Sequence, residues 1–158
     1  MSKKQSAKTD ILGIVTFGLF LIIVAVIFMS TPDLLDRILD FFRDFTLQQL
    51  APYIYLPAPK SDHPTLYRAV FQFCLAFATI HIPILGARFL LKESVNRKAE
   101  TISSILFWFG AAWIINLLLT IDIAWYSFLG YLIALIGVSI VTWSVIILIA
   151  LTLRKPAS

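Results

Sequence analysis

The chain has 158 residues, of which 59% are hydrophobic and only 14% are charged. Ordinary soluble proteins are about 45–50% apolar and about 25% charged, so this composition excludes a typical soluble domain and indicates an integral membrane protein. The net charge of +4 does not indicate a nucleic-acid partner, because nearly all the basic residues flank apolar stretches instead of forming a separate basic arm. The length predicts a single membrane domain covering residues 1–158.

Four apolar stretches are long enough to cross a bilayer, since hydrocarbon about 30 Å thick requires about 20 helical residues. We expect these spans at about residues 11–29, 66–91, 101–119 and 125–153. The first stretch follows several lysines, as a signal peptide would, but its apolar run is too long for a signal core, so we expect a retained helix. Strand-like alternation is missing from all four stretches, and lipid otherwise accepts only helices. The sequence therefore predicts an all-α fold, a four-helix bundle in the membrane.

The basic residues predict how these spans are oriented. Nine of the thirteen share a side with both chain ends, and these nine are Lys3, Lys4, Lys8, Arg88, Lys92, Arg97, Lys98, Arg154 and Lys155. Because cytoplasmic loops carry an excess of lysine and arginine, we expect a multi-pass protein of the cell membrane with both termini in the cytoplasm.

The first external connection, residues 31–65, carries the most individual features. Thr31-Pro32-Asp33 is typical of a helix start, with the Thr31 hydroxyl as the N-cap and Pro32 in the first turn. An additional amphipathic, interfacial helix is expected over about residues 33–45, lying along the outer membrane surface or docked over the bundle. Three prolines within residues 50–59 preclude a regular helix there. The connection either only caps the bundle or also presents a docking surface for a partner.

Ionisable and strongly polar side chains inside a span are costly, so each raises a functional hypothesis. His81 lies near the middle of the second span. It is either a proton relay or ligand contact, or a neutral imidazole bonded to a carbonyl, to Asn116 or to Ser103. The remaining candidates share the outer end of the predicted bundle, where we expect any polar pocket, and are Arg68, Gln72, Asn116 and Asp122.

Cysteine and histidine offer no metal or cofactor site. Cys74 is the only cysteine, which excludes an intrachain disulfide. No Cys/His cluster has zinc-ligand spacing, and His63, the only other histidine, lies in the outer connection, far from His81. We expect no cofactor.

Three classes of function remain open. The favoured class is a non-catalytic membrane protein, either an accessory or scaffold subunit or an oligomerising protein. Its expected partners are the lipid bilayer and either another membrane protein or a second copy of the chain. The alternative is a small transporter or channel that acts as an oligomer, with its polar site around His81 or at the outer cluster. A membrane enzyme is the least supported class, because HExxH, GxSxG and P-loop motifs are missing from the sequence.

Small residues on one stripe of the fourth span mark either packing within the chain or a contact between chains. This stripe comprises Gly130, Ala134, Gly137, Val141 and Ser144.

Overall fold

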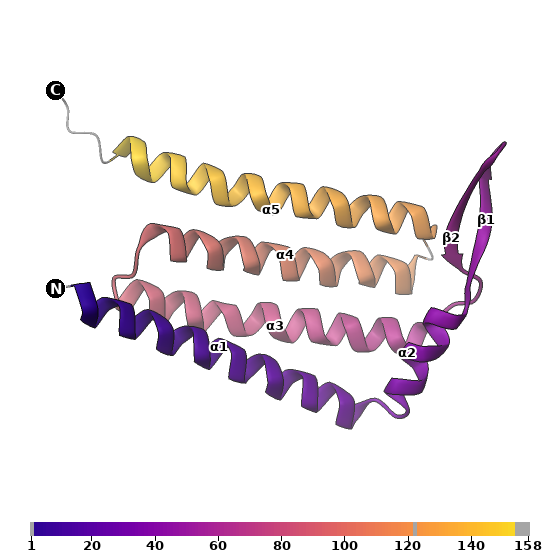
Figure 1. Ribbon diagram of the computed structural model, residues 1–158, viewed down its shortest axis with the longest axis horizontal. Coiled ribbons are helices and arrows are strands. Elements are labelled where there is room, and N and C mark those ends of the chain that lie inside the picture. The colour runs from indigo at the N-terminus through magenta and orange to yellow at the C-terminus, as the bar shows by residue number, and fades with distance from the viewer. Residues whose placement is uncertain (1, 122, 154–158) are drawn as a thin grey trace.

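The computed structural model describes residues 2–121 and 123–153, with side chains from residue 11 onward (Figure 1). The chain is mostly helical, and the all-α prediction is corrected by one β-hairpin in the connection between the first two spans. The elements are α1 (Ser2–Ser30), α2 (Leu34–Arg43), β1 (Phe45–Ala51), β2 (Ile54–Pro59), α3 (Pro64–Leu90), α4 (Val95–Thr120) and α5 (Trp125–Leu153).

Within the described residues, four helical segments are long and apolar enough to cross a membrane, and these are Ile11–Ser30, Pro64–Leu90, Val95–Thr120 and Trp125–Leu153. This is the pattern of a multi-pass membrane protein. The bounds agree with the predicted spans except at the start of α4, which was expected near residue 101. The helix begins earlier because Ser94, with a non-helical backbone (φ −59°, ψ 151°), ends the turn after α3 and the polar residues 95–100 already continue the helix.

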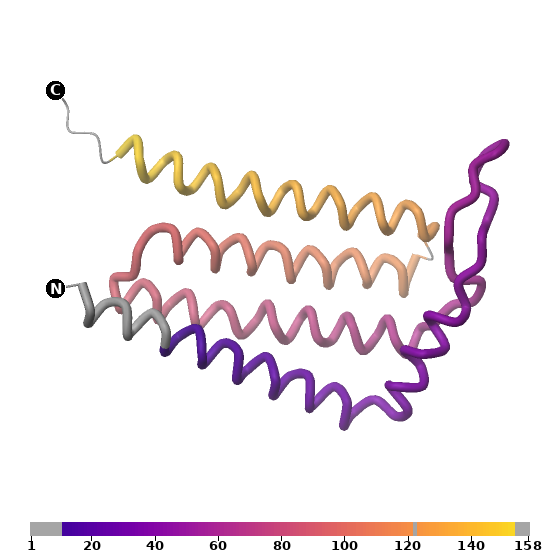
Figure 2. Tube along the Cα trace, in the orientation of Figure 1, coloured from indigo at the N-terminus to yellow at the C-terminus, as the bar shows by residue number. Residues whose placement is uncertain are grey.

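The four long helices lie side by side in the order α1, α3, α4, α5 (Figure 1 and Figure 2). Helix α3 packs most extensively on α4, α4 also packs on α5, and α1 packs mainly on α3. Cys74, Ala111, Ala112 and Ile115 form a buried cluster at the α3–α4 contact, where small side chains let the backbones approach closely. The arrangement leaves α1 and α5 at the two ends of a row, and both carry many exposed apolar side chains.

Helix α2 follows α1 through a sharp turn and lies at the adjoining ends of α1 and α3 (Figure 1). It begins at Leu34, and its N-cap is Asp33 in a left-handed conformation (φ 54°) with no side-chain capping bond. The prediction that Thr31 caps this helix is therefore wrong, because the Thr31 amide donates to the carbonyl of Ile27 and closes α1 instead. Leu34 packs with Leu66 and Ala69 of α3 in a second buried cluster.

The hairpin β1–β2 occupies the segment whose prolines preclude a helix. Phe45 pairs with Pro59 and Leu47 with Pro57 in an antiparallel register. Proline has no backbone N–H, but each strand of a two-stranded sheet is an edge strand, where this loss is tolerated. Tyr53 makes the turn with a positive φ of 69°. The hairpin tip extends past the N-terminal end of α5 (Figure 1).

Candidate functional site

His81 lies in an aromatic cluster that joins three helices. Its ring contacts Phe77 at a centroid distance of 4.5 Å, and Phe77 contacts Trp108 of α4 at 5.1 Å and Phe20 of α1 at 5.7 Å. The His81 side chain is buried, with 8% of the residue exposed. Such edge-to-face contacts are favourable packing interactions, so the cluster ties α1, α3 and α4 together at mid-span.

The imidazole of His81 has a partner within its own helix. Its Nδ1 lies 2.8 Å from the carbonyl oxygen of Phe77. A carbonyl can only accept, so Nδ1 carries a proton and donates to it. Of the partners considered from the sequence, the carbonyl is thus the one observed, while the Ser103 hydroxyl donates to the carbonyl of Ser139 at 2.6 Å. His81 has the surroundings of a packed, hydrogen-bonded core residue.

Arg68 and Gln72 lie on an exposed face of α3. At about 100° per residue, this face is directed away from that of Tyr67, Phe71 and Cys74, which packs on α4. Arg68 lies near the N-terminal end of α3, where its long side chain can reach the membrane interface. The structure therefore does not bring Arg68 and Gln72 into the α3–α4 contact.

Asn116 is half-buried on α4, and its backbone carbonyl accepts a bond of 2.7 Å from the Thr120 hydroxyl. Asp122 lies outside the described residues. Within the part of the chain that the structure describes, no hydrogen bond joins Asn116 to Arg68 or Gln72.

The small-residue stripe of α5 lies on the face opposite to α4. Phe128 and Leu135 pack against the α3–α4 cluster, and the carbonyl of Ser139 accepts from Ser103, so these residues define the face turned to α4. At about 100° per residue, Gly130 and Gly137 fall on the other side of the helix. A Cβ added at either glycine would have nothing within 4 Å. The stripe is therefore not used for packing within the chain.

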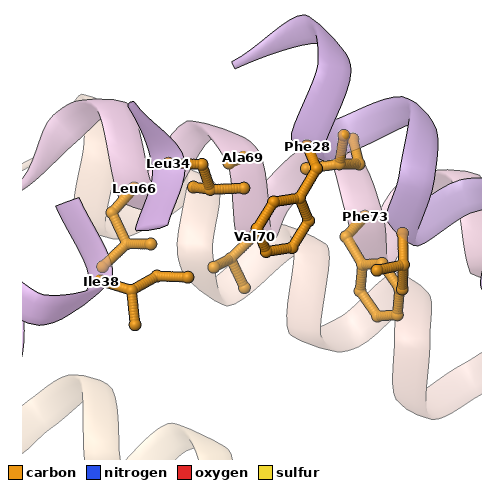
Figure 3. Close-up of a pocket in the computed structure, with 9 residues that line it drawn as sticks. Phe28, Leu34, Ile38, Leu66, Ala69, Val70 and Phe73 are labelled. Carbon is orange, nitrogen blue, oxygen red and sulfur yellow. The ribbon is translucent and has the colours of Figure 1, made fainter. Parts of the chain in front are cut away.

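A cavity of about 160 Å³ lies where α1, α2 and α3 meet (Figure 3). Phe28, Leu34 and Val70 are among the side chains around it, one from each helix, and all its lining residues are apolar. Ligand sites normally combine an apolar lining with a few polar groups that orient the ligand. This cavity has no such group, and therefore lacks the character of a catalytic site.

Asp44, Ser61 and His63 close the base of the hairpin. The Asp44 carboxylate accepts from the Ser61 backbone N–H at 2.6 Å, from the Ser61 hydroxyl at 3.3 Å, and lies 3.0 Å from His63 Nε2. The Ser61 N–H holds the pKa of Asp44 below its usual 3.8, with His63 adding to this and desolvation opposing it. Because the carboxylate stands between serine and histidine, this is not a nucleophilic triad, in which histidine is the central group.

The sequence carries no local signal for this Asp44 cluster, since its members are joined across 17 and 19 residues by the hairpin. The small-residue stripe of α5 can be recognised in the sequence. The direction in which it faces cannot, because that depends on the packing of α4 against the other side of α5. No family model matches the chain, and no match was found among curated proteins or among solved structures. Function is therefore inferred from the chain's own residues.

Proposed function

We propose that this protein is a non-catalytic membrane subunit that assembles laterally with a second copy of itself through the exposed face of α5. The observation that carries the proposal is the position of the small-residue stripe, which lies opposite the face that packs on α4. Small residues at this spacing allow two helix backbones to approach closely in lipid. A second copy would continue the row beyond α5.

The hairpin adds a second contact to the same assembly. The Tyr126 hydroxyl of α5 donates to the carbonyl of Leu56 at 2.9 Å and holds β2 over the end of α5. The tip reaches beyond α5, and Tyr53 at the tip is 96% exposed beside exposed Ile54 and Tyr55. A neighbour seated on α5 would lie beneath these apolar side chains and cover them. Contiguous exposed apolar surface of this kind is typical of an interaction site.

The membrane arrangement belongs to the same proposal. The four spans form a helical bundle with their neighbours in the assembly, and α2 acts as an amphipathic helix at the outer surface. Leu34 and Ile38 of α2 contact the other helices, while Leu35, Leu39 and Phe42 are exposed and would meet the lipid interface. The start of α1 and the end of α5 lie on the same side of the long helices, which would be the cytoplasmic side.

Cysteine cross-linking in membranes tests the α5 contact. In a Cys74→Ala background, Gly137→Cys is expected to form a disulfide-linked dimer under mild oxidation, because the stripe of one copy faces that of the other. Val138→Cys is the matched control, since the next residue points about 100° away around the helix. Equal cross-linking at both positions would indicate random collisions and contradict the proposal.

Native mass in lipid nanodiscs tests the same face without cysteine. Gly137→Leu fills the stripe and should convert the oligomer to a monomer, whereas Val138→Leu should leave it intact. A wild-type monomer would overturn self-association. If Gly137→Leu instead releases a different chain, the exposed face of α5 is still the contact surface. The partner is then that chain and not a second copy.

A further inference from the structure

A groove of about 480 Å³ runs between α4 and α5, on one flank of their contact. It is distinct from the small-residue stripe, because none of the stripe residues lines it. Unlike the cavity at α2, this groove combines polar and apolar side chains. Its lining consists of Glu100, Ser103, Ser104, Phe107, Ile136, Ser139, Ile140 and Trp143.

The polarity of the groove changes along the helix axis. Helices α4 and α5 run in opposite directions, and the bond between the Ser103 hydroxyl and the Ser139 carbonyl sets their register. By this register Trp143 lies near the level of Glu100, and Ile136 near that of Phe107. Seven residues from Glu100 to Phe107 span about 10 Å. A carboxylate and an indole therefore occupy the mouth, hydroxyls the middle, and apolar side chains the deep end.

The middle of the groove holds a hydroxyl without a partner. Ser139 is buried, with 8% of the residue exposed, and its Oγ has no hydrogen bond within the described residues. Ser144, elsewhere on α5, is by contrast satisfied locally, by the carbonyl of Ile140 at 2.9 Å. A buried polar atom left unpaired costs free energy. Ser139 lines the groove, so its hydroxyl can serve as a hydrogen-bond partner for a group bound there.

The charge at the mouth selects a cation. Glu100 accepts from the Asn96 amide at 2.8 Å and lies 3.6 Å from an exposed Arg97 guanidinium. An exposed ion pair of this kind contributes little, so the carboxylate remains able to attract a second cation. Trp143 provides an aromatic ring at the same level, and aromatic faces attract cations.

We propose that the α4–α5 groove binds the primary ammonium group of an amphiphilic amine. The ammonium has three N–H donors and no acceptor, which suits the Glu100 carboxylate and the Ser139 hydroxyl as acceptors. The hydrocarbon tail runs toward Phe107 and Ile136. A charged head at the interface and a tail directed to mid-membrane is also the orientation of a lipid in a leaflet. The ammonium comes either from an ethanolamine lipid headgroup or from a free alkylamine.

The probe is octylamine, titrated calorimetrically into the full chain in dodecyl maltoside micelles, with protein-free micelles as the blank. We expect saturable binding that is at least about tenfold tighter than that of octanol, since hydrogen bonds to a charged group contribute about 1.5–3 kcal/mol. Octyltrimethylammonium, which has the charge but no N–H donor, should bind more weakly than octylamine. If octanol or octyl sulfate binds as tightly as octylamine, the groove recognises only the alkyl chain, which would overturn the proposal.

Variants locate the binding in the groove. Glu100→Gln and Trp143→Leu should each weaken octylamine binding about tenfold, and Ser139→Ala should reduce the preference for octylamine over octyltrimethylammonium. Ser144→Ala is the matched serine control and should bind as wild type. Gly137→Leu should also bind normally, which separates this site from the proposed self-association. Wild-type binding by both Glu100→Gln and Ser139→Ala would contradict the proposal.

Competition identifies the source of the ammonium. Lysophosphatidylethanolamine carries the primary ammonium and should displace octylamine if a lipid headgroup is the natural ligand, whereas lysophosphatidylcholine should not. Octylamine binding that resists both lipids assigns the groove to a free amine. Equal displacement by the two lipids would mean that the N–H donors are not recognised, which contradicts the proposal.

Discussion

The side chain of Leu135 on α5 occupies the space that Gly110 on α4 leaves open. A Cβ at position 110 would clash with one terminal methyl group of Leu135 and crowd the other. We therefore expect Gly110→Ala to overpack the α4–α5 contact and to lower the free energy of unfolding by about 1–3 kcal/mol. Thermal unfolding in detergent measures the loss.

Two further variants test this explanation. Gly86→Ala should be neutral or slightly stabilising, because nothing lies within 4 Å of a Cβ there and alanine favours the helix by about 1 kcal/mol. Adding Leu135→Ala to Gly110→Ala should restore room for the new methyl group, so the two changes should not be additive. Strict additivity would mean that the clash with Leu135 is not the cause.

His81 is expected to act through packing. His81→Ala removes a buried ring from the cluster around Phe77 and should cost about 3 kcal/mol of unfolding free energy. His81→Phe keeps the ring and loses only the bond to the Phe77 carbonyl, which should cost about 1 kcal/mol. Ile82→Ala is the exposed control on the same turn. A nitrogen NMR spectrum without a protonated Nδ1 would contradict this assignment.

The sequence predicts the spans well because hydropathy is a local property of each stretch. It could not predict which helix faces meet. Arg68 and Gln72 share a face with each other, as expected, but that face is turned away from α4 by the apolar packing around Cys74. The hairpin was missed for a related reason, because the pairing of Phe45 with Pro59 is non-local and its prolines weigh against a strand except at an edge.

Ser139 illustrates a different limit of sequence reasoning. Pattern alone places it among ordinary small residues of the fourth span. Only the packing of α5 on α4 turns its hydroxyl into a buried group without a partner. The position of α5 at the end of the row therefore gives its faces different roles, since one face packs on α4 and the opposite face stays exposed.

The turn between α3 and α4 contains a buried ion pair. Arg88 Nη1 lies 3.6 Å from Glu93 Oε2, and the two side chains are 13% and 7% exposed. Removing one partner of a buried pair leaves the other charge uncompensated, so Glu93→Ala should cost about 3 kcal/mol of unfolding free energy. Glu100→Ala breaks a pair with Arg97 at the same distance of 3.6 Å but far more exposed, and should cost less than about 1 kcal/mol. Equal losses in detergent unfolding would contradict the role of burial.

The Asp44 cluster makes the attachment of the hairpin sensitive to acid. The folded pKa of Asp44 is lowered below 3.8, mainly by the Ser61 N–H, so its ionised form is favoured by folding. A depressed pKa adds stability above the unfolded value, and this is lost as the pH falls through the lower folded value. Amide exchange at Ser61 should therefore rise below about pH 4 relative to that of core amides. Asp44→Asn should exchange faster at neutral pH and lose the acid step, whereas Asp62→Asn should keep it. An acid step that persists in Asp44→Asn would assign the sensitivity to another group.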